Sequence, residues 1–218
     1  MYLSQIKLRR AEGGRGSLAK LLAAQSGSYD AHRLVWGFFG DTRDRERDFL
    51  YRLDNRAGDV TIHALSTRKP SDETGLFTID VRPAPLTHPA GAELEFLLVA
   101  NAVKTRKGQR HDIVLDRLKE LRAEGEEPKT LSVAQEQGHQ WLKSQGCQAG
   151  FAVIQSSILT YGQQTFKSPR GAPIKHAVME LTGRLRVTDP DAFSTAVGRG
   201  FGKAKAYGCG LMLLKPAA

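Results

Sequence analysis

A tyrosine and a histidine near the N-terminus are spaced to act together. Tyr29 and His32 stand three residues apart in the segment SYDAHRLVWGFFG, so a helix that begins there places the phenol and the imidazole on one face. Histidine suits proton transfer because its unperturbed pKa is about 6.5. RNA carries its own nucleophile, the ribose 2′-OH, so proton transfer and neutralisation of the phosphorane charge can cut it without a metal ion. A histidine on an ordinary helix surface has the same local sequence, and spacing alone leaves both interpretations open.

A glycine-rich run near the C-terminus is suited to a phosphate-rich ligand. The sequence VGRGFGKAKAYGCG, residues 197–210, combines glycines, which let a backbone approach phosphates, with the cations Arg199, Lys203 and Lys205. It lacks the preceding strand of a dinucleotide fingerprint. It also lacks the glycine spacing of a P-loop, and Ala204 stands where that motif has a hydroxyl residue. We therefore expect no nucleotide cofactor.

Two other basic segments could contact RNA phosphates. Residues 104–110 contain no acidic residue, and their cations are Lys104, Arg106, Lys107 and Arg110. Residues 163–175 include two prolines and a glycine, and their cations are Lys167, Arg170 and Lys175. The second segment could equally be an ordinary surface loop.

Composition narrows the class of partner. The 218 residues include 32 Lys and Arg against 23 Asp and Glu, a net charge of +9, which favours a polyanion such as nucleic acid or an acidic membrane. No apolar run is long enough to span a bilayer, and the first twenty residues lack the apolar core of a signal peptide. The sequence therefore predicts a cytoplasmic protein without a membrane segment.

Cysteine and histidine usage predicts no metal or disulfide. Cys147 and Cys209 belong to no Cys-x-x-Cys or Cys/His cluster, and we expect both to be buried thiols. The histidines outside the first motif are scattered, without metal-ligand spacing. They are His63, His88, His111, His139 and His176.

The elements that must position the first motif form an α+β pattern. Alternating apolar residues predict a strand over 2–8, and helical spacing predicts a helix from a Ser28 or Asp30 cap to Gly40. Two runs separated by Asn55 and Gly58 predict a hairpin, and residues 76–84 predict a fourth strand. The connection before that strand is too short for a long helix. The second helix of this half is therefore expected to be vestigial.

A similar order returns after the proline-rich stretch 83–89. The expected elements are a strand at 92–100, helices at 113–125 and 132–146, strands at 151–162 and 176–189, a capped helix from 189, and a strand at 209–215. We predict two tandem ferredoxin-like domains of RRM or RAMP type, residues 1–88 and 89–218, whose sheets leave a central basic cleft. This prediction depends on element order, because no clear sequence repeat is present.

Several segments resemble one family when they are taken together. They are the opening MYLSQIKL, the pattern of Tyr29, His32 and Trp36, ANAVKT at 100–105, WLK at 141–143 and GFGKAKAYGCGLMLL at 200–214. In this order and spacing, from residue 1 to about 214, they resemble the CasE endoribonucleases of type I-E CRISPR systems. The stretch 9–25 departs from the family in being longer and richer in glycine.

The resemblance implies an activity and partners. Such enzymes recognise the RNA hairpin of each CRISPR repeat and cleave at its 3′ base through the 2′-OH, leaving a 2′,3′-cyclic phosphate or its opened form. They keep the guide within Cascade with its other subunits, and this chain would be a monomer outside that complex. By position, His32 matches the catalytic histidine, Tyr29 its neighbouring tyrosine and Arg33 an RNA contact. Which of the two proton transfers His32 performs stays open.

Two rival interpretations remain. In the first, the chain is a non-catalytic subunit of the same fold that binds an RNA hairpin, and His32 is incidental. In the second, it is an RRM-type module that stacks single-stranded RNA on aromatic side chains, although the RNP1 signature of such modules is missing.

Overall fold

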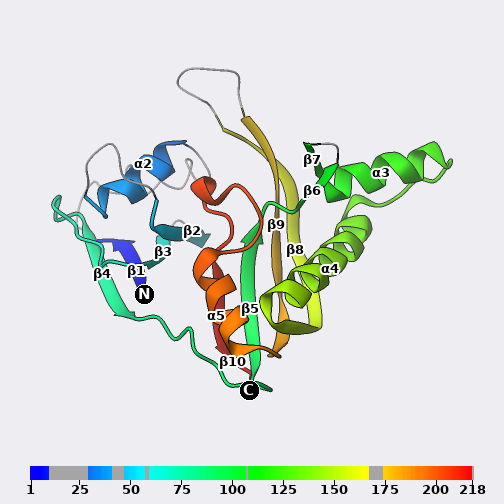
Figure 1. Cartoon of the computed structure of the whole chain (residues 1–218). Helices are drawn as coiled ribbons and strands as arrows, with labels where there is room; N and C mark the ends of the chain where they lie inside the picture. The colour runs from blue at the N-terminus through cyan, green and yellow to red at the C-terminus, as the bar shows by residue number, and fades with distance from the viewer. Residues whose placement is uncertain (10–28, 41–46, 57–58, 107, 167–173, 218) are drawn as a thin grey trace.

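The first half of the chain forms one antiparallel sheet covered by a helix. The computed structural model describes residues 1–9, 29–40, 47–56, 59–106, 108–166 and 174–217, without the side chains at 29–31, 56, 59, 166 and 174. The elements of this half are β1 (Tyr2–Leu8), α2 (Tyr29–Gly37), β2 (Phe49–Arg56), β3 (Asp59–Ser66) and β4 (Phe77–Pro83). The sheet order is β2-β3-β1-β4 (Figure 1). As expected, residues 67–76 hold no helix.

The alternation of each strand decides which face α2 covers. Ile6 of β1 pairs with Ile62 of β3 and Ile79 of β4. Ile6 and Ile62 are buried in one apolar cluster with Val35 of α2. Leu50, on the opposite face of this sheet, belongs to the core of the second half. The first sheet is therefore packed on both faces, with α2 on one side and the second half on the other.

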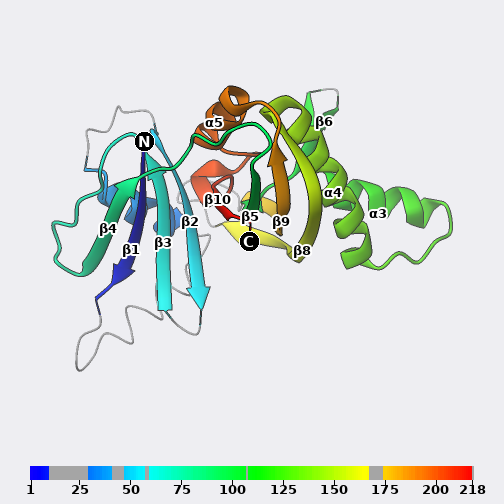
Figure 2. The ribbon, with the colours of Figure 1, turned by 90° about the horizontal axis from the view of Figure 1, so that it is seen from below.

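The second half repeats the strand order of the first. Its sheet holds β5 (Glu93–Ala100), β8 (Phe151–Phe166), β9 (Ile174–Val187) and β10 (Met212–Pro216), in the order β10-β5-β9-β8 (Figure 2). Its helices are α3 (Ile113–Ala123), α4 (Thr130–Ala149), α5 (Pro190–Arg199) and the 3-10 helix η1 (Lys205–Tyr207). In both halves the first and third strands are central, which is the ferredoxin-like order. The prediction of two tandem ferredoxin-like folds is confirmed.

Three sequence predictions need correction. The hairpin of β6 (Val103–Arg106) and β7 (Gln109–Asp112) was not expected, and β8 extends beyond the predicted end at residue 162. Cys147 is exposed on α4, whereas Cys209 is buried as predicted.

The predicted domain boundary after residue 88 falls between β4 and β5 and stays a prediction. No helix in the described ranges is long and apolar enough to cross a membrane.

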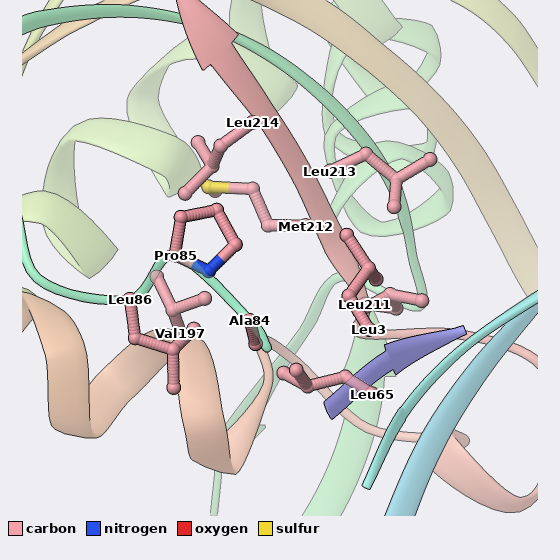
Figure 3. Close-up of a pocket in the computed structure, with 10 residues that line it drawn as sticks. All are labelled: Leu3, Leu65, Ala84, Pro85, Leu86, Val197, Leu211, Met212, Leu213 and Leu214. Atoms are coloured by element: carbon pink, nitrogen blue, oxygen red, sulfur yellow. The ribbon is translucent and has the colours of Figure 1, made fainter. Parts of the chain in front are cut away.

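Apolar contacts and one ion-pair network join the halves. A small apolar pocket between them is lined by residues of β1, β3, the connection after β4, α5 and β10 (Figure 3): Leu3, Leu65, Ala84, Pro85, Leu86, Val197, Leu211, Met212, Leu213 and Leu214. Elsewhere, Arg52 of β2 is 4% exposed and donates to Glu180 of β9 at 2.5 Å and to Asp54 at 2.5 Å. A buried guanidinium needs such partners, because an unpaired buried charge is costly.

Candidate active site at the junction of the two halves

His32 lies on α2, half-buried, with one ring nitrogen held by a neighbour. The indole Nε1–H of Trp36, one helical turn later, donates to His32 Nε2 at 2.8 Å. The two rings meet edge to face with centroids 5.9 Å apart. An indole N–H only donates, so His32 Nε2 is an acceptor in this arrangement. The contact favours the neutral imidazole.

Tyr51 connects this histidine to the second half of the chain. Its side chain is 1% exposed, its ring centroid lies 6.5 Å from that of His32, and its hydroxyl donates to the Ala206 carbonyl at 2.9 Å. Ala206 lies in η1, which packs against α2 and β2 (Figure 1). Burial raises the pKa of Tyr51 above its ordinary value, so the phenol stays protonated. The helix that carries His32 is therefore seated against a turn of the other domain.

Positive charge from both halves gathers around Arg47, whose guanidinium acts on His32. Burial lowers the pKa of His32, the Arg47 guanidinium lowers it further, and the Ala206 carbonyl opposes them. Burial also lowers the pKa of Lys205, with further lowering by Arg47, Arg199 and Lys203. We call these four cations, Arg47, Arg199, Lys203 and Lys205, the basic junction. Cations that depress one another's pKa form a site where an anion would be stabilised.

Packing within the protein explains two of the glycines in the glycine-rich run. Gly200 has a φ of +73°, and a Cβ there would lie 2.6 Å from Leu50 of β2. Gly210 has a φ of +95°, and a Cβ there would lie 2.8 Å from the Phe201 carbonyl oxygen. Only glycine fits these positions without strain. The backbone–phosphate contact expected of this run is therefore not required to explain those two glycines.

The predicted RNA-binding residues are distributed unevenly. Arg33, Arg110, Lys175, Arg199 and Lys203 are exposed. Lys205 is half-buried and donates to the Arg199 carbonyl at 2.7 Å. The side chain of Tyr29, although it begins α2, and all of Lys107, Lys167 and Arg170 lie outside the described residues.

The expectation that residues 104–110 lack acidic partners is wrong for two of them. Lys104 of β6 forms an ion pair with Asp116 of α3, and Arg106 lies 3.2 Å from the same carboxylate. Asp116 comes four residues after β7, in the first turn of α3, and folding brings its carboxylate to the side chains of β6. Lys104 and Arg106 are therefore partly neutralised before any RNA binds.

Sequence reasoning did not find several residues near this site. Arg47 and Tyr51 were not singled out, although the alternation of Arg47, Phe49 and Tyr51 before and along β2 shows that they share a face. His176 of β9 lies against Tyr207 of η1, with ring centroids 5.1 Å apart. Burial lowers the pKa of His176, with a further lowering by Arg110. No local signal in the sequence relates His176 to the distant Tyr207.

The described residues bring together no three His, Cys, Asp or Glu side chains that could hold a metal ion. The polar side chains at the junction of the two halves instead carry an imidazole, phenols and cationic groups. Such a set can transfer protons and bind an anion.

The sequence also matches a known family. A model of CRISPR associated proteins matches residues 1–216. The chain belongs to this CRISPR-associated protein family. The CRISPR system Cascade subunit CasE of Escherichia coli (strain K12) is a relative, 27% identical over 207 residues that cover 91% of this chain and 98% of CasE.

Solved structures of CRISPR-associated proteins share the fold. The CRISPR endoribonuclease Cse3 bound to a 19-nucleotide RNA has a TM-score of 0.74 at 20% identity, covering 99% of this chain and 100% of that one. Thermus thermophilus Cse3, bound to an RNA representing a pre-cleavage complex, gives 0.72 at 20% identity over the same shares. Cas6e from Escherichia coli str. K-12 gives 0.67 at 23% identity, with both chains fully covered. The tandem ferredoxin-like fold is therefore common to these proteins and to this CRISPR-associated chain.

Proposed function

We propose that this protein is a metal-independent endoribonuclease that binds the hairpin of a CRISPR repeat RNA and cleaves the precursor at its 3′ base. The observation that carries the proposal is the position of His32, half-buried on α2 beside Arg47, around which cations of the second half gather. Family membership and the endoribonuclease and Cascade names of the relatives support the same substrate.

The reaction needs two proton transfers and one anion site. The 2′-oxygen attacks the adjacent phosphorus and loses its proton, while the bond to the 5′-oxygen breaks and that oxygen gains a proton. The products are a 2′,3′-cyclic phosphate and a 5′-hydroxyl. His32 performs one of these transfers, and Tyr29 orients it or the phosphate. The basic junction lowers the energy of the doubly charged phosphorane.

Binding extends beyond the reacting phosphate. The cations that we propose to contact the hairpin are Arg33, Lys104, Arg106, Lys107, Arg110, Lys167, Arg170, Lys175, Arg199, Lys203 and Lys205. They would lie along a cleft between the two sheets. The cleaved guide stays bound and joins other Cascade subunits in the cytoplasm, and the chain is a monomer until then.

Substitution of His32 tests the activity directly. His32→Ala is expected to lower single-turnover cleavage of a cognate repeat hairpin by about 10²–10⁴-fold, the usual contribution of a general acid or base. Hairpin affinity is expected to change little, because the lost group moves a proton and carries no phosphate contact. The assay is repeated in EDTA, where full activity is expected because no metal takes part.

His139→Ala is the matched control, since His139 is also half-buried on a helix but lies on α4, bonded to Ser156. Cleavage by that variant should equal that of the wild type. Undiminished cleavage by His32→Ala would remove the catalytic role of His32, whereas no cleavage by the wild-type protein would leave a subunit that binds the hairpin without cutting it. Loss of activity in EDTA would indicate a metallonuclease.

A further inference from the structure

One cation of the basic junction differs from the others in its surroundings. Arg47 comes two residues before Phe49, the first residue of β2, and strand alternation places it on the face of Phe49 and Tyr51. That face meets α2, because Phe49 contacts Trp36 with ring centroids 5.2 Å apart and Tyr51 contacts His32 at 6.5 Å. Arg47 therefore belongs to the same layer as His32.

The guanidinium of Arg47 is incompletely satisfied. Its Nε is buried, and among the described residues it has no hydrogen-bond partner. No ion pair joins Arg47 to any carboxylate of the described ranges, whereas the neighbouring Arg52 pairs with Asp54 and Glu180 and Arg68 with Asp48. A buried cationic donor without a partner costs free energy, and an anionic acceptor would recover it.

The other cations of the junction are less suited to act on the reacting group. Lys205 already donates to the Arg199 carbonyl, and Arg199 and Lys203 are exposed to solvent, where water screens their charge. The charge of Arg47 is half-buried and close enough to His32 to act on its protonation. Electrostatic stabilisation is stronger where water is excluded.

We propose that Arg47 is a catalytic residue that donates hydrogen bonds to the non-bridging oxygens of the scissile phosphate beside His32. This inference rests on the proposed ribonuclease function. As the 2′-oxygen attacks, the charge on the phosphoryl group rises from −1 to −2, and a fixed guanidinium fork stabilises that state more than the ground state. Arg47 moves no proton itself, because arginine stays protonated in proteins. The proton transfers remain with His32 and its partners.

Paired substitutions at Arg47 test this role. Arg47→Met keeps the length of the side chain and removes the charge and donors, whereas Arg47→Lys keeps the charge and loses the fork. We expect Arg47→Met to lower the single-turnover rate at saturating repeat hairpin by about 10²–10³-fold, as when one oxyanion donor is lost. Arg47→Lys should fall between Arg47→Met and the wild type. Affinity is measured with a hairpin carrying 2′-deoxyribose at the cleavage site, and it should fall far less than the rate.

Arg82→Met is the control, since Arg82 is exposed on β4, at the sheet edge opposite β2. It removes the same charge and should leave the rate unchanged. A wild-type rate in Arg47→Met would overturn the role of Arg47. A loss confined to affinity, with a normal rate at saturation, would equally overturn it, since Arg47 would then bind the ground state only.

Failure of this inference is distinct from failure of the proposed function. If wild-type protein cleaves, His32→Ala does not and Arg47→Met does, only the assignment of Arg47 fails. If wild-type protein does not cleave, the proposed function itself fails. Should Arg47→Met lose its cooperative thermal transition, Arg47→Lys decides. A folded Arg47→Lys with an undiminished rate shows that charge alone suffices, which overturns the bidentate contact.

Discussion

The protonation of His32 is controlled by contacts from three sides. The Trp36 indole occupies Nε2 from the same helix, and burial together with Arg47 disfavours the imidazolium form. The Ala206 carbonyl from the second half acts in the opposite direction. The balance keeps the pKa of His32 below its ordinary value, so the neutral form dominates at pH 7.

Trp36→Phe isolates the indole contribution. Phenylalanine keeps an aromatic ring but has no N–H, so the neutral imidazole loses a bond that the protonated form cannot accept. The pKa of His32 is expected to rise, and the inflection assigned to His32 in an NMR titration of the imidazole Cε1–H should move to higher pH. Trp141→Phe, at a residue packed against the core of the second half, is the control and should leave that inflection in place. An unchanged or lower pKa in Trp36→Phe would contradict this account.

The orientation of α2 relative to β2 depends on a clamp just beside Arg47. Arg68, after β3, donates to the carbonyl of Phe39, two residues beyond the end of α2, at 2.5 Å and to Asp48 Oδ2 at 2.7 Å. The Thr67 hydroxyl donates to the same carboxylate oxygen at 2.9 Å. Hydrogen bonds from Arg68, with smaller effects from Thr67, lower the pKa of Asp48 to about 2 against opposing burial. This clamp, made of Arg68, Asp48 and Thr67, joins the segment that follows α2 to Asp48, the residue after Arg47.

Asp48→Asn should weaken that clamp in a pH-dependent way. Because the folded-state pKa of Asp48 lies below its value of 3.8 in the unfolded chain, its stabilisation is present above about pH 4 and is lost as pH falls from 3.8 to about 2. At pH 7 we expect the free energy of unfolding to drop by about 1–2 kcal/mol, with a smaller difference at pH 2. Urea unfolding at both pH values measures it. Asp80→Asn, exposed on β4, should show no such difference; an equal loss at both pH values in Asp48→Asn would contradict the assignment.

Hydrophobic periodicity predicted the elements better than the site. β1, α2, β5 and α5 are strongly patterned, and each appears close to its predicted range. The β6–β7 hairpin was missed because VKTR and QRHD are short and mostly polar on both faces, so they show no alternation. Arg47 was missed for another reason: its neighbours in space come from α2 and η1, and local sequence carries no record of such long-range packing.

The two halves are held as one body by contacts of different kinds. Apolar side chains of both halves line the pocket near β10, and Tyr51 bonds to η1 (Figure 3). Arg52, almost fully buried, joins β2 to Glu180 of β9. Since His32 and Lys205 come from different halves, the geometry of the proposed site depends on this packing.

Glu180→Gln tests the link between the halves. Removing the carboxylate leaves Arg52 buried with Asp54 as its remaining acidic partner, and we expect the free energy of unfolding to fall by about 1–3 kcal/mol. Glu95→Gln is the matched control, because Glu95 pairs with the exposed Lys215 within one sheet and should cost less than about 1 kcal/mol. Chemical denaturation compares the two. Equal losses would show that Arg52 contributes nothing beyond a surface pair.

The bond between the Tyr51 hydroxyl and the Ala206 carbonyl has a consequence for how relatives are compared. The acceptor is a main-chain atom, so residue 206 can change freely over evolution while the bond persists. An alignment would then show a variable position at the centre of the domain contact. Surveys that rank positions by conservation would overlook it, and only insertions or deletions in the turn would reveal its importance.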